Sequence, residues 1–160
     1  MNLTKEYLLE IFEYKNNDLY WRADKGRAKQ GEVAGSIDYH GYRQVKIDQK
    51  IYLCHRLVFF IHHSYLPDCI DHIDRNPLNN SIENLRECTP SENSMNRGMR
   101  RDNTSGVKGV YWYKPTKKWK AQLFFKGKNN SLGYYESKQQ AEQAVKKARE
   151  KYHGEFSNHG

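Results

Sequence analysis

The sequence predicts an α+β protein in which small antiparallel strands and short helices precede a three-stranded antiparallel sheet packed on one helix. Two patterns support this prediction. Short runs of alternating apolar and polar residues, typical of half-buried strands, recur along the chain. Apolar residues at helical spacing, with capping residues such as Ser137 and Gln140 in front of them, predict the helices.

The first 68 residues are expected to form a helix, several short strands and a second helix. Residues 4–14 place Tyr7, Leu8, Ile11 and Phe12 on one helical face. The second helix is expected over residues 55–65 and should end before Pro67. Between these helices, strands are predicted at residues 19–21, 33–35, 42–47 and 51–53.

Residues 69–98 predict a ββα unit. The alternation over residues 69–73 indicates a strand in which Asp71 and His72 point to opposite faces. A polar loop, residues 74–81, leads to a second run at residues 82–88. A helix then begins with Thr89 as cap and Glu92 as its capping-box partner, so Asn93 falls in the first or second turn. Such a unit can bring Asn93 beside the first strand.

The side chains of this unit suit a metal-assisted phosphodiesterase. A hard divalent cation prefers carboxylate and amide oxygens, and an attacking water needs a neutral imidazole to take its proton. We therefore expect Asp71 and Asn93 to share one cation and His72 to act as the base. We interpret Asp74 as a turn former, and His55 is not included among the catalytic residues.

Composition excludes several other classes of protein. The chain has 160 residues, of which 37% are apolar and 13% aromatic, as expected for a polar globular protein of one or two small domains. No apolar run reaches the length of a membrane span, and no signal pattern opens the chain, so we expect a cytoplasmic protein. The three cysteines form no CxxC pair, and we expect them to be reduced and not catalytic.

The net charge of +8 is unevenly distributed. Lys and Arg outnumber Asp and Glu by twelve to four in residues 104–160, whereas the two signs nearly balance before that. We expect a polyanion to bind mainly through the C-terminal segment. A lysine-rich surface that only serves solubility is the alternative interpretation.

The predicted ββα unit, together with the start of the helix before it, resembles the HNH endonuclease family, in the branch of phage and intron-encoded homing nucleases. The resemblance rests on residues 55–58, 71–80, 82–86, 89–90 and 92–93. It implies a ββα-metal (His-Me finger) fold, His72 as general base, Asp71 and Asn93 as metal ligands, and Asn84 as the residue that orients the base. Asn84 could equally serve only to fix the loop backbone. One Mg²⁺ or Mn²⁺ per active site is implied, with no organic cofactor.

The C-terminal segment is expected to form three strands and a helix, after a linker at residues 99–105. Alternation places Val110, Trp112, Trp119, Ala121 and Leu123 on the helix side of the sheet. It leaves a mixture of cations, an amide and aromatics on the open face, which suits a DNA groove: Lys108, Tyr111, Tyr113, Lys120, Gln122 and Phe124.

Residues 103–156 resemble the APETALA2-type DNA-binding domain through residues 105–110, 119–123 and 132–135 and the Ala-rich helix that follows. In that family the sheet enters the major groove, so the resemblance implies that the open-face residues contact double-stranded DNA. Arg75 and Arg86, in the motif region, are further candidates for phosphate contacts.

The predicted organisation is a nuclease domain at residues 1–98, with its core at about 69–98, and a DNA-binding domain at residues 106–160. We expect a DNA endonuclease of phage or homing type that nicks or cleaves. A DNA-binding regulator with an inactive nuclease core and a nucleic-acid packaging protein are the alternatives.

Overall fold

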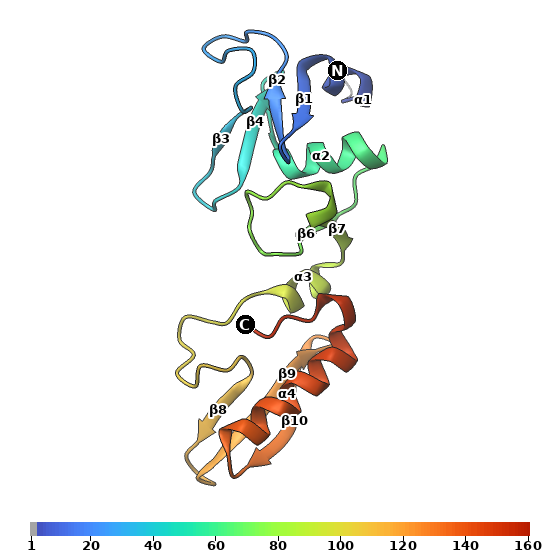
Figure 1. The fold of residues 1–160 in the computed structure, drawn as a ribbon. Coiled ribbons are helices and arrows are strands. Elements are labelled where there is room, and N and C mark those ends of the chain that lie inside the picture. The colour runs from blue at the N-terminus through green and yellow to red at the C-terminus, as the bar shows by residue number, and fades with distance from the viewer. Residues whose placement is uncertain (1–2) are drawn as a thin grey trace. The chain divides into compact units, whose positions relative to one another are not determined.

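The computed structural model describes residues 3–160, and within them it contains four α-helices and four small antiparallel sheets (Figure 1). The α+β class expected from the sequence is confirmed. The chain divides into two compact units, the first ending at Cys88 and the second spanning Thr89–Gly160. None of the helices within residues 3–160 has the length and apolarity needed to cross a membrane.

The first unit contains three sheets and two helices. Its sheets are the pair β1–β2, the three strands β3–β4–β5 and the pair β6–β7, all antiparallel. The elements are α1 (Lys5–Ile11), β1 (Phe12–Lys15), β2 (Asp18–Trp21), β3 (Ser36–Ile37), β4 (Arg43–Ile47), β5 (Lys50–Leu53), α2 (Cys54–His63), β6 (Cys69–His72), the 3₁₀ turn η1 (Ile82–Asn84) and β7 (Leu85–Cys88).

The first helix is shorter than predicted. Thr4 caps α1 by accepting a hydrogen bond from the Tyr7 amide (3.2 Å), but the helix ends at Ile11 and Phe12 already begins a strand. Phe12 lies opposite Trp21 in the β1–β2 hairpin, which turns at two asparagines with positive φ, Asn16 (49°) and Asn17 (61°). Two consecutive residues with left-handed conformation form the tight turn that a hairpin favours. Because this turn pairs the residues on either side of it, Phe12 lies in the sheet and not in the helix.

The prediction of a strand at residues 33–35 is wrong. In its place lie one isolated bridge, Tyr20 to Val33, and the short strand β3. The remaining expected strands of this region are present as β2, β4 and β5, and the second helix is present as α2. Ser64, in the left-handed conformation (φ 62°), ends α2 before Pro67.

The core of the first unit is formed by the helices packing on β2, β4 and the motif strands. Burying these apolar side chains is the main stabilising contribution available to a unit of this size. The core includes Leu8, Phe12, Leu19, Trp21, Val45, Ile47, Leu57, Val58, Ile61, Ile70 and Leu85.

The second unit contains one sheet of order β10–β9–β8 and two helices. Both capping boxes predicted from the sequence are present, at Thr89 with Glu92 and at Ser137 with Gln140. The elements are α3 (Pro90–Asn96), β8 (Val110–Tyr113), β9 (Lys118–Phe125), β10 (Lys128–Tyr135), α4 (Lys138–His153) and the 3₁₀ turn η2 (Gly154–Phe156).

The helix side of this sheet is only partly as predicted. Val110, Ala121 and Leu123 are buried, and Val110 and Ala121 pack with residues of α4. The prediction for Trp112 is wrong: its side chain is 47% exposed and lies edge-on to Trp119, with ring centroids 5.3 Å apart. The buried cluster on the helix side is formed by Val110 and Ala121 with Ala141 and Val145 of α4, and Trp112 is not part of it.

The helix α3 belongs with the second unit, and the division of the chain falls ten residues before the predicted linker. Side chains from distant parts of the unit bind α3 and its C-terminal end. Lys108 Nζ donates to the carbonyl oxygens of Met95 (3.1 Å), Arg97 and Asn158 (3.1 Å). Asn158 Nδ2 donates to Asn96 Oδ1 (3.2 Å).

His55, on the buried face of α2, gives the first unit a predictable sensitivity to acid. Burial lowers the pKa of His55 to about 3, with smaller contributions from His72 and Arg56. Because the unfolded chain binds a proton near pH 6.5 and the folded one does not, stability is full above that pH and falls as pH decreases toward 3. At pH 5 this loss should be about 2 kcal/mol.

Urea unfolding at pH 7.5 and at pH 5, followed by circular dichroism, tests this prediction. His55→Gln should show a smaller loss of stability on acidification than the wild type, whereas His40→Gln, at an exposed position, should keep the wild-type loss. Equal losses in all three proteins would contradict the prediction.

Candidate functional site

The candidate site lies at the end of β6, where Asp71 and His72 are each 5% exposed. In the β6–β7 register, Asp71 lies opposite Arg86 and His72 lies opposite Leu85. Two ionisable side chains buried side by side need polar partners, since an uncompensated buried charge is costly. The partners of each residue therefore define the site.

Arg86 is the partner of Asp71. Its Nε and one terminal nitrogen donate to Asp71 Oδ2 at 2.9 and 2.7 Å, and its side chain is 14% exposed. The sequence suggested Arg86 as a phosphate contact; the structure places it in an ion pair inside the motif. This pair compensates the charge of the buried carboxylate.

His72 is held in surroundings that favour its neutral form. Burial lowers the pKa of His72, and the contact with Asn80 and the charges of Asp74 and Asp71 oppose only part of that effect. Its ring lies 5.0 Å from the ring of His55 and 5.9 Å from that of Tyr42, measured between centroids. A neutral imidazole at neutral pH can accept a proton, as a general base must.

A series of polar contacts that the sequence did not predict connects His72 through Asn80 and Asp18 to Arg43. His72 Nε2 lies 3.3 Å from Asn80 Oδ1, and Asn80 Nδ2 donates to Asp18 Oδ1 at 3.3 Å. Asp18 Oδ2 in turn lies 2.7 Å from Arg43 Nε, an ionic contact in which the N–H is poorly aligned with the oxygen. Asn80 is 1% exposed and Asp18 8% exposed. The only sequence signal was the position of Asn80 within the polar motif.

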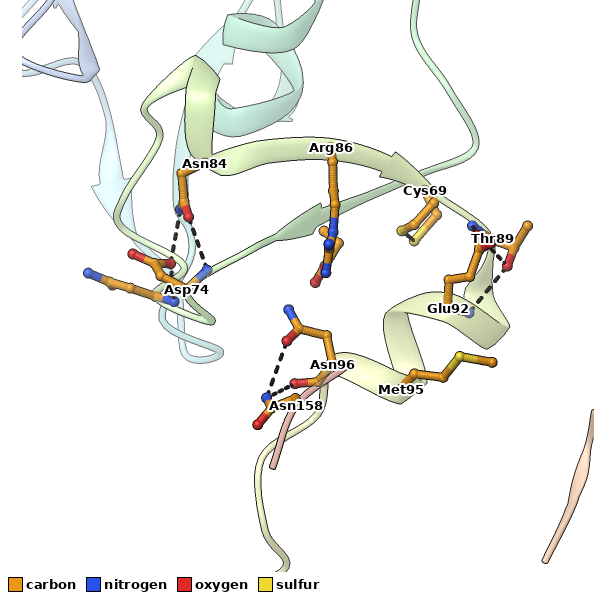
Figure 2. Close-up of polar contacts among 12 residues, drawn as sticks. Cys69, Asp74, Asn84, Arg86, Thr89, Glu92, Met95, Asn96 and Asn158 are labelled. Carbon is orange, nitrogen blue, oxygen red and sulfur yellow. Dashed lines mark hydrogen bonds and ion pairs between the residues drawn. The ribbon is translucent and has the colours of Figure 1, made fainter. Parts of the chain in front are cut away.

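Asn84 stabilises the motif loop (Figure 2). Its Nδ2 donates to Asp74 Oδ1 (2.9 Å) and to the Asn79 carbonyl (2.8 Å), and its Oδ1 accepts from the Asp74 amide (3.0 Å). These contacts hold both ends of the loop together. They agree with the interpretation in which Asn84 fixes the loop backbone.

Asp74 is the turn former that the sequence predicts. Its carboxylate accepts hydrogen bonds from Asn79 Nδ2 (2.7 Å) and the Asn76 amide (2.8 Å) as well as from Asn84. Burial acts to raise the pKa of Asp74, but these hydrogen bonds outweigh it and lower the pKa. The loop is thus closed around an ionised carboxylate.

The two predicted metal ligands belong to different units. Asp71 lies on β6 in the first unit, and Asn93 lies in the first turn of α3 in the second. The element order β6, β7, α3 is that of the predicted ββα unit, but the packing of α3 on the strands and the approach of Asn93 to Asp71 stay predictions. Within residues 3–160, no cluster of three or more His, Cys, Asp and Glu side chains forms a metal site. One carboxylate and one amide oxygen nevertheless suit a hard ion that keeps water and phosphate ligands.

The open face of the second unit's sheet gathers aromatic side chains around one lysine. Lys120 Nζ lies 5.8, 5.6 and 5.7 Å from the ring centroids of Tyr111, Tyr113 and Tyr134. Tyr111 donates to Gln122 Oε1 (3.3 Å), and Phe124 is 47% exposed. A cavity of about 680 Å³ lies beside this face and is lined by Tyr111, Gln122, Phe124, Arg97 and Arg100, among others. Tyr134 was missed from the predicted set.

Lys108 and Arg75 differ from that group. The ammonium of Lys108 is engaged by the three carbonyl oxygens around α3, so the structure gives it a role within the unit. Arg75 is exposed in the motif loop, where it has a positive φ of 66°. Cys69 and Cys88 face each other across β6 and β7, and their sulfurs lie 3.3 Å apart in a hydrogen bond.

Replacing Asn84 by alanine should destabilise the first unit by about 1–3 kcal/mol, because the Asp74 amide and the Asn79 carbonyl lose their partner. Amide hydrogen exchange at Asp74 should become faster at the same time. Urea unfolding and exchange measured by NMR check both effects. Asn129→Ala, at an exposed position of the second unit, is the control. Unchanged exchange at Asp74 in Asn84→Ala would show that these bonds do not hold the loop.

Comparisons with known proteins fall on this same region. Residues 52–95 match the HNH endonuclease family. The chain is 38% identical over 90 residues to Protein 3.8 of Escherichia phage T7, covering 55% of this chain and 72% of that protein. It is 33% identical over 88 residues to the uncharacterized HNH endonuclease L560 of Acanthamoeba polyphaga mimivirus, covering 55% of this chain and 44% of that protein. No solved structure matches the chain.

The matched segment contains every residue assigned to the active site from the sequence: Asp71, His72, Asn84 and Asn93. Its strands and loop are those around the buried Asp71 and His72. The chain therefore contains an HNH endonuclease domain, at residues 52–95.

Proposed function

We propose that this protein is a divalent-metal-dependent DNA endonuclease that hydrolyses a phosphodiester bond with a water activated by His72. The observation that supports this most strongly is the state of His72. Its imidazole is buried at the end of β6, its pKa is lowered by that burial, and it lies within the segment that matches the HNH family. It can therefore accept a proton at neutral pH.

In the proposed mechanism, His72 accepts a proton from water as the water attacks the scissile phosphorus. Asp71, through its carboxylate, and Asn93, through its amide oxygen, would hold the ion, which supplies charge stabilisation at the phosphate and the leaving oxygen when bound. The hard oxygen donors favour Mg²⁺ or Mn²⁺ over a soft metal. Arg86 keeps the Asp71 carboxylate in a fixed position on β6.

The charge of the two units supports a division of labour in DNA binding. Residues 1–88 contain 12 Lys and Arg against 13 Asp and Glu, whereas residues 89–160 contain 15 against 6. Since DNA binding depends on neutralising phosphates, most of the electrostatic attraction should come from the second unit. We infer that this unit positions the nuclease domain on its target.

Within the second unit, we assign the DNA contact to the open face of the sheet around Lys120. The three tyrosines, Gln122 and Phe124 offer aromatic and amide groups beside that cation, which suits a groove of double-stranded DNA. Arg97 and Arg100, which line the adjacent cavity, add positive charge. The bonds of Lys108 within the unit make it a weaker candidate. Arg75 remains a candidate for phosphate binding in the first unit.

Replacement of the proposed base tests the nuclease function. His72→Ala should reduce Mg²⁺-dependent nicking of supercoiled plasmid about 10²- to 10⁴-fold, which is the usual contribution of a general base. The wild type without a divalent ion should be inactive. His40→Ala, at an exposed position, is the control and should nick like the wild type.

Two outcomes would count against the nuclease proposal. Absence of nicking by the wild type with either Mg²⁺ or Mn²⁺, together with intact DNA binding, would favour a DNA-binding protein with an inactive core. Equal nicking by the wild type and His72→Ala would show that His72 is not the general base.

Replacement of the lysine at the centre of the sheet tests the DNA face. Lys120→Gln should weaken binding to duplex DNA and reduce the slope of log K against log salt by about 1, as expected for one phosphate contact. Fluorescence anisotropy across a salt series measures both quantities. Lys146→Gln, on α4 and paired with Glu142, is the matched control. The same slope for Lys120→Gln and the wild type would place the contact elsewhere.

A further inference from the structure

We propose that Asp18 and Asn80 are positioning residues for His72, holding its ring in the tautomer that carries the proton on Nε2 and keeps the lone pair on Nδ1. This inference rests on the proposed role of His72 as the base, and it names the residues that prepare the base for its task. Asp18 lies on β2, outside the segment that matches the family. The site would thus include a residue from the N-terminal hairpin.

The first step concerns the orientation of the Asn80 amide. An ionised carboxylate only accepts hydrogen bonds, whereas an amide side chain has one donating and one accepting end. Asn80 Nδ2 lies 3.3 Å from Asp18 Oδ1, so the donating end faces the carboxylate. The reversed orientation would place two oxygens against each other. Asp18 therefore determines which way the Asn80 amide points.

The second step concerns the ring of His72. With its nitrogen turned toward Asp18, Asn80 presents Oδ1 to His72 Nε2 at 3.3 Å. A carbonyl oxygen cannot donate, so this contact is a hydrogen bond only when Nε2 carries the proton. In the neutral imidazole the other nitrogen, Nδ1, is then the basic one. The water that His72 activates should lie on the Nδ1 side of the ring.

The third step concerns the rigidity of the chain of contacts. Asp18 is held by an ionic contact of Oδ2 with Arg43 Nε at 2.7 Å and by the Leu19 amide, which donates to Oδ1 at 2.9 Å. Asn80 is 1% exposed, and its backbone amide donates to the Leu78 carbonyl at 3.1 Å. A buried polar chain of this kind is costly unless each member is satisfied, so turning the Asn80 amide would be penalised.

The tautomer of His72 is measured directly by NMR of the full chain with ¹⁵N-labelled histidine, at mildly alkaline pH. The signals of His72 are identified by their loss in His72→Gln. The wild type should show a protonated Nε2 and an unprotonated Nδ1. In Asn80→Ala the carbonyl partner is lost, and in Asp18→Asn the partner of Asn80 can both donate and accept. Both variants should show averaged shifts from a mixture of tautomers.

The same variants are then assayed for nicking under single-turnover conditions. Loss of a residue that orients a functional histidine typically costs about 10- to 100-fold in activity. Asn80→Ala and Asp18→Asn should therefore be slower by about that factor in turnover, with DNA affinity unchanged. Asp24→Asn, which changes an exposed acid paired with Lys29, is the matched control and should behave as the wild type.

The outcomes separate this inference from the proposed function. A wild-type His72 protonated on Nδ1, or a wild-type pattern in both folded variants, would overturn the positioning role even if His72 is required for nicking. Loss of DNA affinity with unchanged turnover would also overturn it. Equal nicking by His72→Ala and the wild type would instead refute the proposed function, whatever the NMR spectra show.

Discussion

Burial of Asp71 and His72 next to each other on β6 is the constraint on which the rest of the first unit depends. Each side chain must have polar partners, and those partners come from different elements. Arg86, on the neighbouring strand, pairs with Asp71, while Asn80, from the motif loop, contacts His72 and joins it to Asp18 of the N-terminal hairpin. The polar contacts of Asp71 and His72 therefore hold the hairpin, the loop and the β6–β7 pair in one arrangement.

The loop between β6 and β7 is rich in asparagine, and these side chains form many of its polar contacts. Asparagine can donate and accept at once, so Asn79 and Asn84 close the loop around Asp74 while Asn80 links His72 to Asp18. These asparagine side chains are uncharged, and residues 1–88 contain slightly more Asp and Glu than Lys and Arg. The excess of positive charge lies in residues 89–160, which we propose to bind DNA.

Local signals in the sequence predicted part of this structure. The alternation at residues 69–72 gave the motif strand, and the capping boxes at Thr89 and Ser137 gave two helix starts, because both patterns depend only on neighbouring residues. The β1–β2 hairpin was missed because two left-handed asparagines competed with a helical pattern. The pairing of Asp71 with Arg86 can be predicted only once the register of β6 and β7 is known. The contact of Asn80 with Asp18 joins residues 62 positions apart, so no local sequence pattern predicts it.

The central claim is that His72 takes the proton of the attacking water. Chemical rescue tests it most directly: single-turnover, Mg²⁺-dependent cleavage of a labelled DNA duplex by His72→Ala, with and without added imidazole. The account predicts slow cleavage by the variant, restored in part by imidazole, and no such restoration for Asp71→Ala. Cleavage by His72→Ala at the wild-type rate without imidazole would contradict the account.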